Sequence, residues 1–389
     1  MSLLFRRRVF GAVVAALALA AGGSVAATTH AQAQAAGTAA GTAAGTAAGA
    51  AAGAGAAAGT AGLTVAQRAS QTGGDSSALP SWAIGPFQRY QGNPLLTPPA
   101  DPTSSTSWEW PEAFNPGVVV VNGVFHMLYR GAASGDYSSI GAATSTDGHN
   151  FTPDPDNPVI KMALPSETHG VEDPRLYYLD GKYYAFFTGY NGTNIGINEA
   201  VSDNALDWTQ LGPVIPNDKD GAVVADPEGK PVLIDGHYLM YYGQSGNGTY
   251  LAESTDMVHW TTVGDVNTGF PASYDPYEFC VAVTDYKTTA NGPVQDGIDL
   301  FVAGELMGSG RWYYAISEID FSRDNLLTDA AALNTPVLYP QAPYEVFGYT
   351  PHTVFMNDII FYKNKWWMYY GAGDEVVALA NAPLRPGNG

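Results

Sequence analysis

One hairpin-like segment recurs five times along the chain, and this repeat limits the possible folds more than any other feature of the sequence. Each copy is a turn followed by a strand of alternating residues, and the copies start at Asn122, Asp180, Asp235, Asp296 and Lys363. Successive starts lie 58, 55, 61 and 67 residues apart. Asn-Gly and Asp-Gly pairs are strong hairpin signals, because both central residues of a type I′ turn need positive φ.

A first strand precedes each of these turns. After most copies comes another strand and then a polar turn that leads into a fourth, which predicts four strands per repeat. In repeats of this kind, each unit buries its faces against its neighbours. The sequence therefore predicts an all-β fold, specifically a five-bladed β-propeller, in which closure of the ring removes most exposed strand edges. A β-sandwich is the structural alternative, but it does not explain a fivefold repeat.

The first 35 residues are predicted to be an export signal peptide. Three arginines at positions 6–8 precede an apolar run, and Ala31-Gln32-Ala33 has the small-x-small pattern of a cleavage site. The apolar run is shorter than the roughly 20 residues that a membrane-spanning helix needs. We therefore expect a secreted protein, exported by the Sec or the twin-arginine route, with no insertion into a membrane.

Residues 36–78 are predicted to be a flexible linker, because they begin with Ala/Gly/Thr repeats whose side chains are too small to build a core. The remaining residues, 79–389, are predicted to form the propeller domain and are numerous enough to bury a large core.

The charge and composition exclude several classes of function. The formal net charge is −20, and such an acidic surface repels nucleic acid, whose binding requires clustered Lys and Arg. Cys280 is the single cysteine, which excludes an internal disulfide and a cysteine-rich metal site. The seven histidines show no paired metal spacing, so we expect neither a metal nor a cofactor. The 23 tyrosines and 8 tryptophans suit a protein that binds neutral sugars.

Charged and polar residues cluster at the predicted first strand of each blade. Because these strands would line the central channel, with their starts facing one opening, residues distant in sequence would converge in space. The cluster contains Glu112, Asn115, Glu172, Asp173, Arg175, Lys219, Asp220, Asp275, Glu278 and His352. This convergence predicts a binding pocket.

Five segments of the chain resemble glycoside hydrolase family 130, the β-mannoside phosphorylases and β-1,2-mannosidases. They are GNPLLTP, EAFNPGVVVVNGVFHMLYRG, GVEDPRLYYLDGKYYAFFTGY, APYEVFGYTPHTVF and NKWWMYYGAGDEVVALA, and they occur in the family's order. The resemblance covers nearly all of residues 87–382.

The resemblance implies roles for individual residues. Asp173 would be the general acid, passing its proton to the glycosidic oxygen through a sugar hydroxyl. Asn115, Arg130 and Asp374 would bind the sugar. Arg175 would either orient Asp173 or hold a hydroxyl, since its planar guanidinium suits bidentate contacts.

Two departures from the family's pattern indicate the acceptor. Tyr242 and Gly243 stand where a phosphate-binding His-Arg pair is expected, and an arginine expected after the second hairpin is absent. Lys219 alone remains, and a phosphate dianion needs several charge-assisted donors. We therefore expect water to be the acceptor. Tyr242, His352 and Lys219 remain candidates for binding the substrate.

An inverting hydrolase needs a second carboxylate to activate water, with roughly 6.5–9.5 Å between the two carboxyl groups. Glu278 is the first candidate for this base because it matches a glutamate of the family's hydrolases, and Glu228 is the second. Trp108 and Trp110 are candidates for stacking on a sugar, whereas Trp208 and Trp260 are predicted to pack between blades.

The sequence and this resemblance thus predict a secreted hydrolase of β-mannosides that is exo-acting, inverting and similar to a β-1,2-mannosidase. Its expected partner is an oligosaccharide or polysaccharide. Three alternatives remain open: an arabinofuranosidase or xylosidase on the same fold, a β-mannoside phosphorylase, and a propeller that binds sugar without catalysis. Fold alone does not distinguish among them.

Overall fold

The computed structural model describes residues 79–384, apart from 136, 245–247, 271–273, 290–291, 307–313, 329–330 and 334. Within strands, side chains are also excluded at 274–280, 285–289, 292–295 and 305–306. The predicted signal peptide (1–35) and linker (36–78) lie outside the described residues. No helix in the described part of the chain is long and apolar enough to span a membrane.

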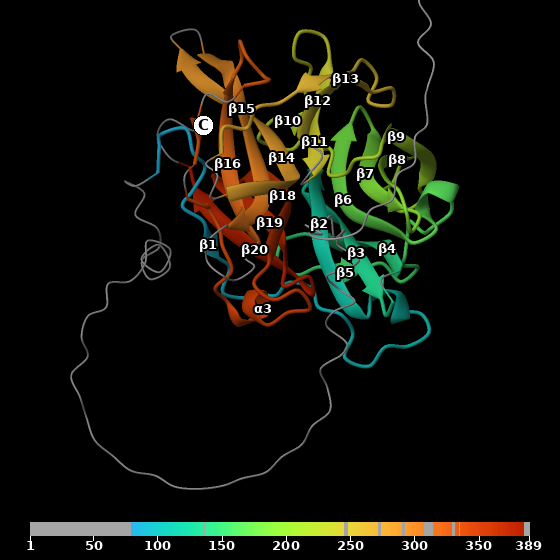
Figure 1. Ribbon diagram of the computed structural model, residues 1–389. Helices are drawn as coiled ribbons and strands as arrows, with labels where there is room; N and C mark the ends of the chain where they lie inside the picture. The colour runs from blue at the N-terminus through green and yellow to red at the C-terminus, as the bar shows by residue number, and fades with distance from the viewer. Residues whose placement is uncertain are drawn as a thin grey trace, which may run out of the picture. The chain divides into compact units, whose positions relative to one another are not determined.

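The described chain consists almost entirely of β-strands, which confirms the predicted all-β class (Figure 1). Its helices are single turns: η2 (Ser107–Glu109), η3 (Pro165–Glu167) and α3 (Pro343–Val346). The strands follow one another in five groups, and the described side chains of the strand that begins each group are mostly buried. The first two groups are β2 (Pro111–Val121), β3 (Val124–Ala133), β4 (Tyr137–Ser145) and β5 (Thr152–Pro153), then β6 (Gly170–Leu179), β7 (Lys182–Tyr190), β8 (Ile195–Ser202) and β9 (Thr209–Pro216).

The other three groups repeat this plan. They are β10 (Ala222–Ala225), β11 (Tyr238–Gln244), β12 (Gly248–Ser254) and β13 (Thr261–Asp265); β14 (Tyr274–Thr289), β15 (Gly292–Leu306), β16 (Tyr314–Ser322) and β17 (Ala331–Ala332); and β18 (Val354–Tyr362), β19 (Lys365–Ala372) and β20 (Val376–Pro383). The last group takes its fourth strand from the other end of the domain, since β1 (Gln88–Arg89) pairs antiparallel with β20.

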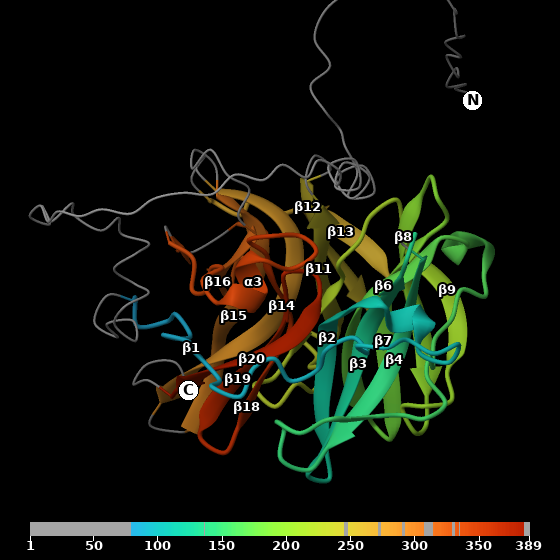
Figure 2. The ribbon, with the colours of Figure 1, turned by 90° about the horizontal axis from the view of Figure 1, so that it is seen from below.

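Strand pairing joins these groups into three sheets instead of five separate four-stranded ones. The sheets have four, eight and eight strands within the described residues. A parallel contact between Ser138 and Gly170 links β4 to β6, and parallel pairs between 224–225 and 282–283 link β10 to β14. Both views place β2 between β6 on one side and β18–β20 on the other (Figures 1 and 2).

Four of the five predicted hairpin turns have the expected backbone conformation. The central pairs 122–123, 180–181, 235–236 and 363–364 all have positive φ, as type I′ turns require. The prediction was wrong for Asp296-Gly297, which lies inside β15. Here β14 and β15 continue past this pair to Thr289 and Gly292, and Gly297 is placed where a Cβ would collide with the Phe321 carbonyl.

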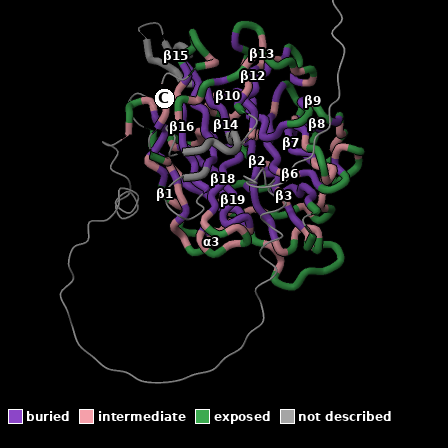
Figure 3. Tube along the Cα trace, viewed as in Figure 1, coloured by how far each residue is buried: buried purple, intermediate pink, exposed green. Residues whose placement is uncertain are grey.

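Burial is concentrated in the first strand of each group and in the hairpin strands beside it (Figure 3). Trp208 and Trp260 pack against the clusters between neighbouring groups, as predicted. Each donates its indole N–H to a carbonyl three residues earlier, at 3.1 and 2.8 Å respectively. These packed layers fix the first strands, and those strands carry the residues of the site.

Candidate active site

Bulges in two neighbouring strands bring Asn115 and Asp173 together. In β2 the register shifts between Phe114 and Gly117, and in β6 it shifts between Glu172 and Arg175. Both bulge residues have positive φ, 48° for Asn115 and 52° for Asp173, a conformation that Asn and Asp tolerate better than most residues. Asn115 Nδ2 donates a 2.7 Å hydrogen bond to Asp173 Oδ1.

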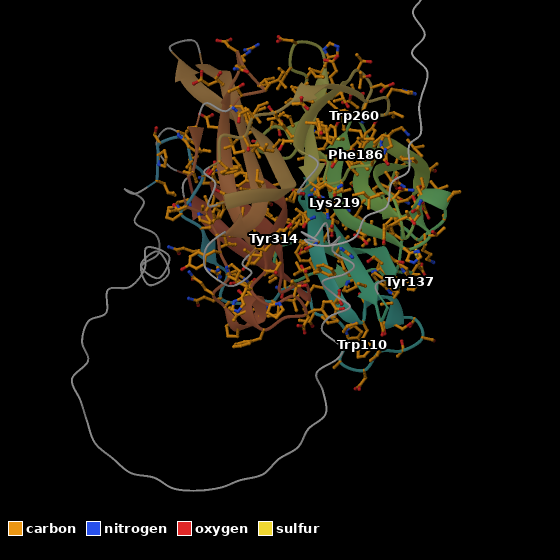
Figure 4. All side chains as sticks on the ribbon, in the orientation of Figure 1. Trp110, Tyr137, Phe186, Lys219, Trp260 and Tyr314 are labelled. Carbon is orange, nitrogen blue, oxygen red and sulfur yellow. The ribbon has the colours of Figure 1, made fainter. Side chains whose placement is uncertain are left out.

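The Asp173 carboxyl group is buried among cations. Only 2% of the residue is exposed. Arg130 Nη1 lies 3.2 Å from Oδ1, and Lys219 Nζ lies 3.9 Å from Oδ2. These three residues come from β6, β3 and the segment before β10, so three groups of strands meet at one carboxyl group. Figure 4 shows Lys219 near the middle of the domain in that view.

The environment of Asp173 holds it ionised. Burial by itself raises the pKa of this carboxyl group, but the charges of Arg130 and Lys219 and the hydrogen bond from Asn115 outweigh it. The net result is a pKa below the ordinary value for Asp. A general acid must be protonated, so the acid role requires that a bound substrate change this environment.

Arg130 connects Asp173 to the solvent-facing side of the site. Its Nη2 lies 3.2 Å from Glu172 Oε1, and its Nε donates to Ser138 Oγ at 2.9 Å. Burial lowers the pKa of Arg130, but the nearby carboxylates, led by Glu172 and Asp173, raise it overall. Charges on Glu112 and Asp374 act in the same direction. The guanidinium therefore stays charged.

Arg175 is buried beside Asp173 and holds its backbone in place. It is 2% exposed, and its Nη1 donates to the Asp173 carbonyl at 2.9 Å and to Asp220 Oδ1 at 2.8 Å. Asp220 also lies 3.4 Å from Lys219 Nζ. Of the two roles predicted for Arg175, this geometry matches the orienting one, because the side chain holds the backbone of the Asp173 bulge and is not exposed to a ligand.

Two further predicted residues lie at the same end of the strands. Asp374 is 7% exposed in the turn between β19 and β20 and acts electrostatically on Arg130. His352 lies just before β18, and its carbonyl accepts the Tyr314 N–H at 3.0 Å. Both have positive φ, 50° and 65°.

Tyr242 does not join the site as predicted. It is 4% exposed and packs in a core cluster, its ring stacks on Tyr250, and its hydroxyl group contacts Thr262 Oγ1 at 2.7 Å. Alternation along β11 directs the side chain into the packed layer.

Glu228 is also separated from Asp173. It is exposed in the turn that follows β10, and the neighbouring Pro227 carbonyl accepts the N–H of Phe361, near the end of β18. Asp173 lies near the start of its strand, so the two carboxyl groups belong to opposite ends of the first strands. Glu228 is therefore not a suitable base.

The other candidate base, Glu278, lies in β14, where its backbone pairs with Gln244 and Ala303. Its side chain, like that of Asp275, is outside the described residues, so the predicted separation of the two carboxyl groups stays a prediction.

The two tryptophans before β2, Trp108 and Trp110, differ in their burial. Trp108 packs on Tyr129, with ring centroids 5.7 Å apart. Its ring also lies against Gly131 and Gly141, where a Cβ would clash with it. Trp108 is half-buried against a core cluster, and its role as a platform for sugar stays a prediction. Trp110 is 40% exposed.

Sequence reasoning missed two buried carboxyl groups near the site. Asp218 is 6% exposed, and burial raises its pKa to about 7. Asp358 accepts the Val118 N–H at 2.6 Å, and burial raises its pKa well above the ordinary value. Asp218 could have been predicted from the charged run Asp218-Lys219-Asp220. Asp358 could not, because it lies in an apolar strand with no such pattern. Among the described residues, no group of three or more His, Cys, Asp or Glu is arranged to hold a metal ion.

Comparisons with known proteins show the family to which this chain is similar. The model of the family Glyco_hydro_130, described as beta-1,4-mannooligosaccharide phosphorylase, matches residues 102–386. A 1,2-beta-oligomannan phosphorylase of Thermoanaerobacter sp. (strain X514) is 27% identical over 76% of this chain and 96% of its own length. A Beta-1,2-mannobiose phosphorylase of the same strain is 26% identical over 75% and 95%.

Solved structures show the same fold. A glycosyl hydrolase from Bacteroides ovatus is 27% identical, with a TM-score of 0.67, over 79% of this chain and 97% of the other. Another structure comes from work on GH130 glycoside hydrolases that target beta-1,2 mannosidic linkages in Candida mannan. It is 27% identical, with a TM-score of 0.64, over 79% and 98%.

Proposed function

This chain belongs to glycoside hydrolase family 130, and on that basis we propose that it is an enzyme that cleaves β-mannosides by inverting hydrolysis from the chain end. The observation that carries this proposal is the buried Asp173 carboxyl group, held between Asn115, Arg130 and Lys219 where three groups of strands meet. The choice of mannosides as the substrate rests on the names of the relatives of this chain.

Asp173 acts as the general acid once substrate has changed its surroundings. A sugar hydroxyl that displaces Asn115 or Arg130 from Oδ1 removes an interaction favouring the ionised form. The pKa of Asp173 then rises, because its burial remains. The hydroxyl can relay the proton to the glycosidic oxygen, and general acid catalysis of this kind contributes about 10²–10⁴-fold.

The charge balance around Asp173 supports water as the acceptor. The three cations, Arg130, Arg175 and Lys219, each already lie within 4 Å of a carboxylate. Among the described residues, five carboxyl groups act on these cations besides Asp218 and Asp358, whose pKa values are raised by burial: Glu112, Glu172, Asp173, Asp220 and Asp374. A phosphate dianion entering this set would meet a net negative environment, whereas a neutral sugar and a water molecule would not.

Glu278 remains the proposed base. Its backbone partner, Gln244, follows Gly243, whose N–H donates to the Lys219 carbonyl at 3.2 Å. The backbone of Glu278 therefore lies beside β11, which contacts the segment that supplies Lys219, and this supports its assignment to the same end of the strands as Asp173.

The five strand groups are proposed to close into a five-bladed propeller. Contacts between β2 and β6, β10 and β14, β14 and β18, and β18 and β2 support this arrangement. Between β6 and β10, the Val223 N–H donates to the Tyr177 hydroxyl group at 2.9 Å. The pairing of β1 with β20 would complete the last blade. Secretion, with 1–35 as the signal peptide, is part of the same proposal and rests on the sequence.

Phosphorolysis is the second candidate, because the family model and both curated relatives carry phosphorylase names. The deciding experiment incubates the purified protein with β-1,2-mannobiose in phosphate-free buffer and follows the products by NMR. We expect α-mannose as the first product, at a rate that added phosphate does not increase. Mannose 1-phosphate formed only with phosphate would show that the acceptor is phosphate.

A matched panel of aryl β-mannoside, α-arabinofuranoside and β-xyloside tests the sugar. We expect turnover of the mannoside alone. Faster turnover of either of the other two would reject the mannoside assignment, and no turnover of any glycoside would favour a non-catalytic protein that binds sugar.

A further inference from the structure

Three aromatic side chains form a ladder across the junction of the first two strand groups. Tyr137 stacks on His169, with ring centroids 5.4 Å apart and an interplanar angle of 29°. His169 meets the ring of Tyr190 edge-on at 5.6 Å. Tyr137 begins β4, His169 precedes β6 and Tyr190 ends β7. Tyr137, His169 and Tyr190 are called the aromatic ladder below.

The aromatic ladder is continuous with the site through its neighbours in sequence. Ser138, beside Tyr137, accepts the hydrogen bond from Arg130 Nε and pairs with Gly170. Gly170, beside His169, lies against Glu172, because a Cβ there would contact Glu172 Oε1. Tyr137 and His169 are therefore each adjacent in sequence to a residue that contacts a charged side chain near Asp173.

Exposure rises along this path. The side chain of Asp173 is 3% exposed, those of Arg130 and Glu172 are 11% and 16% exposed, and Tyr137 is 45% exposed. Figure 4 shows Tyr137 further from the middle of the domain than Lys219. A chain whose end sugar reaches Asp173 would leave the site along this route.

The ladder is held in place before any ligand binds. The His169 N–H donates to the Tyr190 carbonyl at 2.8 Å. Gly192, with φ of 90°, lies against the His169 ring, where any Cβ would clash. A fixed aromatic surface binds with little loss of side-chain entropy.

From these observations we infer that the aromatic ladder is a subsite that binds a sugar ring on the leaving-group side of the scissile bond. The C–H face of a pyranose packs against an aromatic ring, and the acidic residues nearby favour a neutral ligand. This inference rests on the proposed function, because it requires that the chain's end sugar occupy the site at Asp173. It implies that oligosaccharides, which place a further sugar on the leaving-group side, are preferred to aryl mannosides.

Tyr137→Ala tests the subsite in the full-length protein. We expect the ratio of kcat/KM for β-1,2-mannotriose to that for aryl β-mannoside to fall about tenfold, mainly through KM, since one aromatic contact is worth up to about a factor of ten. Tyr137→Phe keeps the ring and should keep the ratio. Leu211→Ala is the matched control, because Leu211 is equally exposed (45%) but lies in the outer strand β9.

A binding measurement separates this inference from the proposed function. Titration of mannotriose into Asp173→Asn, with and without Tyr137→Ala, reports binding whether or not the protein has turnover. We expect the added Tyr137→Ala substitution to weaken binding about tenfold. Equal binding by both variants, or an equal loss for Tyr137→Phe, would overturn the aromatic subsite. Absence of turnover in the wild type, with the binding difference intact, would reject only the hydrolase proposal.

Discussion

Asp173 shows how a single backbone position can determine a site. Positive φ at this bulge turns its carboxyl group toward Asn115, whose own bulge has nearly the same φ. Pro174 follows Asp173, and Pro116 follows Asn115. A proline at a bulge lacks a backbone N–H, but the hydrogen bonding between the strands does not use that donor. The site thus uses local irregularities of otherwise regular strands.

Asp173→Asn should lower kcat by about 10²–10⁴-fold on β-mannobiose, because the amide cannot supply the proton. The loss should be much smaller for a 2,4-dinitrophenyl mannoside, whose leaving group needs no acid. The same substitution at exposed Asp203, paired with Lys182 at 3.2 Å, is the control and should change neither rate. An equal loss on both substrates would indicate that Asp173 binds substrate without acting as an acid.

Asp220→Asn tests the support of the site. Removing this carboxylate leaves Arg175 buried without its 2.8 Å partner and releases Lys219. Breaking one side of a buried ion pair costs about 3–5 kcal/mol, so the free energy of unfolding in urea should fall by about that amount. Asp203→Asn should cost less than about 1 kcal/mol. A similar small cost for both would show that Asp220 is not a structural anchor.

At the scale of the element, β8 carries a buried carboxyl group in a strand that is otherwise ordinary. Glu199 is fully buried, and neither of its carboxyl oxygens has a hydrogen-bond partner among the described residues. Burial, followed by the charge of Asp256, raises its pKa from 4.5 to about 8. The strand therefore holds a neutral glutamic acid at neutral pH.

The pH dependence of stability should reveal this group. Because the folded-state pKa is raised, the unfolded state loses its proton first as pH rises. The contribution of Glu199 to stability is thus fully present below about pH 4.5 and is lost progressively up to about pH 8. The free energy of unfolding in urea should be measured for both proteins between these two pH values. It should fall by a few kcal/mol less in Glu199→Gln than in the wild type, because each unit of pKa difference corresponds to about 1.4 kcal/mol.

Exposed Glu253, on the next group, provides the control. Its side chain is 42% exposed, and Glu253→Gln should follow the wild-type pH profile. Parallel profiles for Glu199→Gln and the wild type would mean that Glu199 is not held neutral in β8.

At the scale of the whole domain, the first and last segments of the described chain are joined. β1 pairs with β20, and Arg89 in β1 binds Glu345 through two hydrogen bonds of 2.7 and 2.9 Å. Glu345 is fully buried and also accepts the Tyr370 hydroxyl group at 2.8 Å. The contact spans 256 residues, so it can form only when the strand groups are in place.

Arg89→Ala should therefore destabilise the whole domain, by about 3–5 kcal/mol, because the Glu345 carboxylate stays buried without its cation. Circular dichroism during thermal unfolding would show this as a lower Tm. Arg323→Ala is the comparison, since that side chain is 46% exposed and 4.0 Å from Asp235. An unchanged Tm for Arg89→Ala would show that the β1 contact does not hold the domain together.

The features that the sequence determined by itself are short-range. Asn122-Gly123 and Asp180-Gly181 set their hairpins because the φ requirement of a turn involves only the residues within it. Alternating residues set the strands for the same reason, so the all-β class and four of the five turns were predictable. The meeting of Asn115 and Asp173 was also predictable, because each lies near the start of a first strand in its repeat.

Tertiary structure decided the features that depend on which segments meet. Asp296-Gly297 has the composition of a turn, yet longer pairing between β14 and β15 keeps it inside a strand. Tyr242 was assigned to the substrate and instead packs in the core, because the free energy of burial depends on neighbours that the local sequence does not name. Likewise, the link from Arg175 to Asp220 and the low pKa of Asp173 arise from charges brought together across separate strand groups, since electrostatic effects depend on distance in space and on burial.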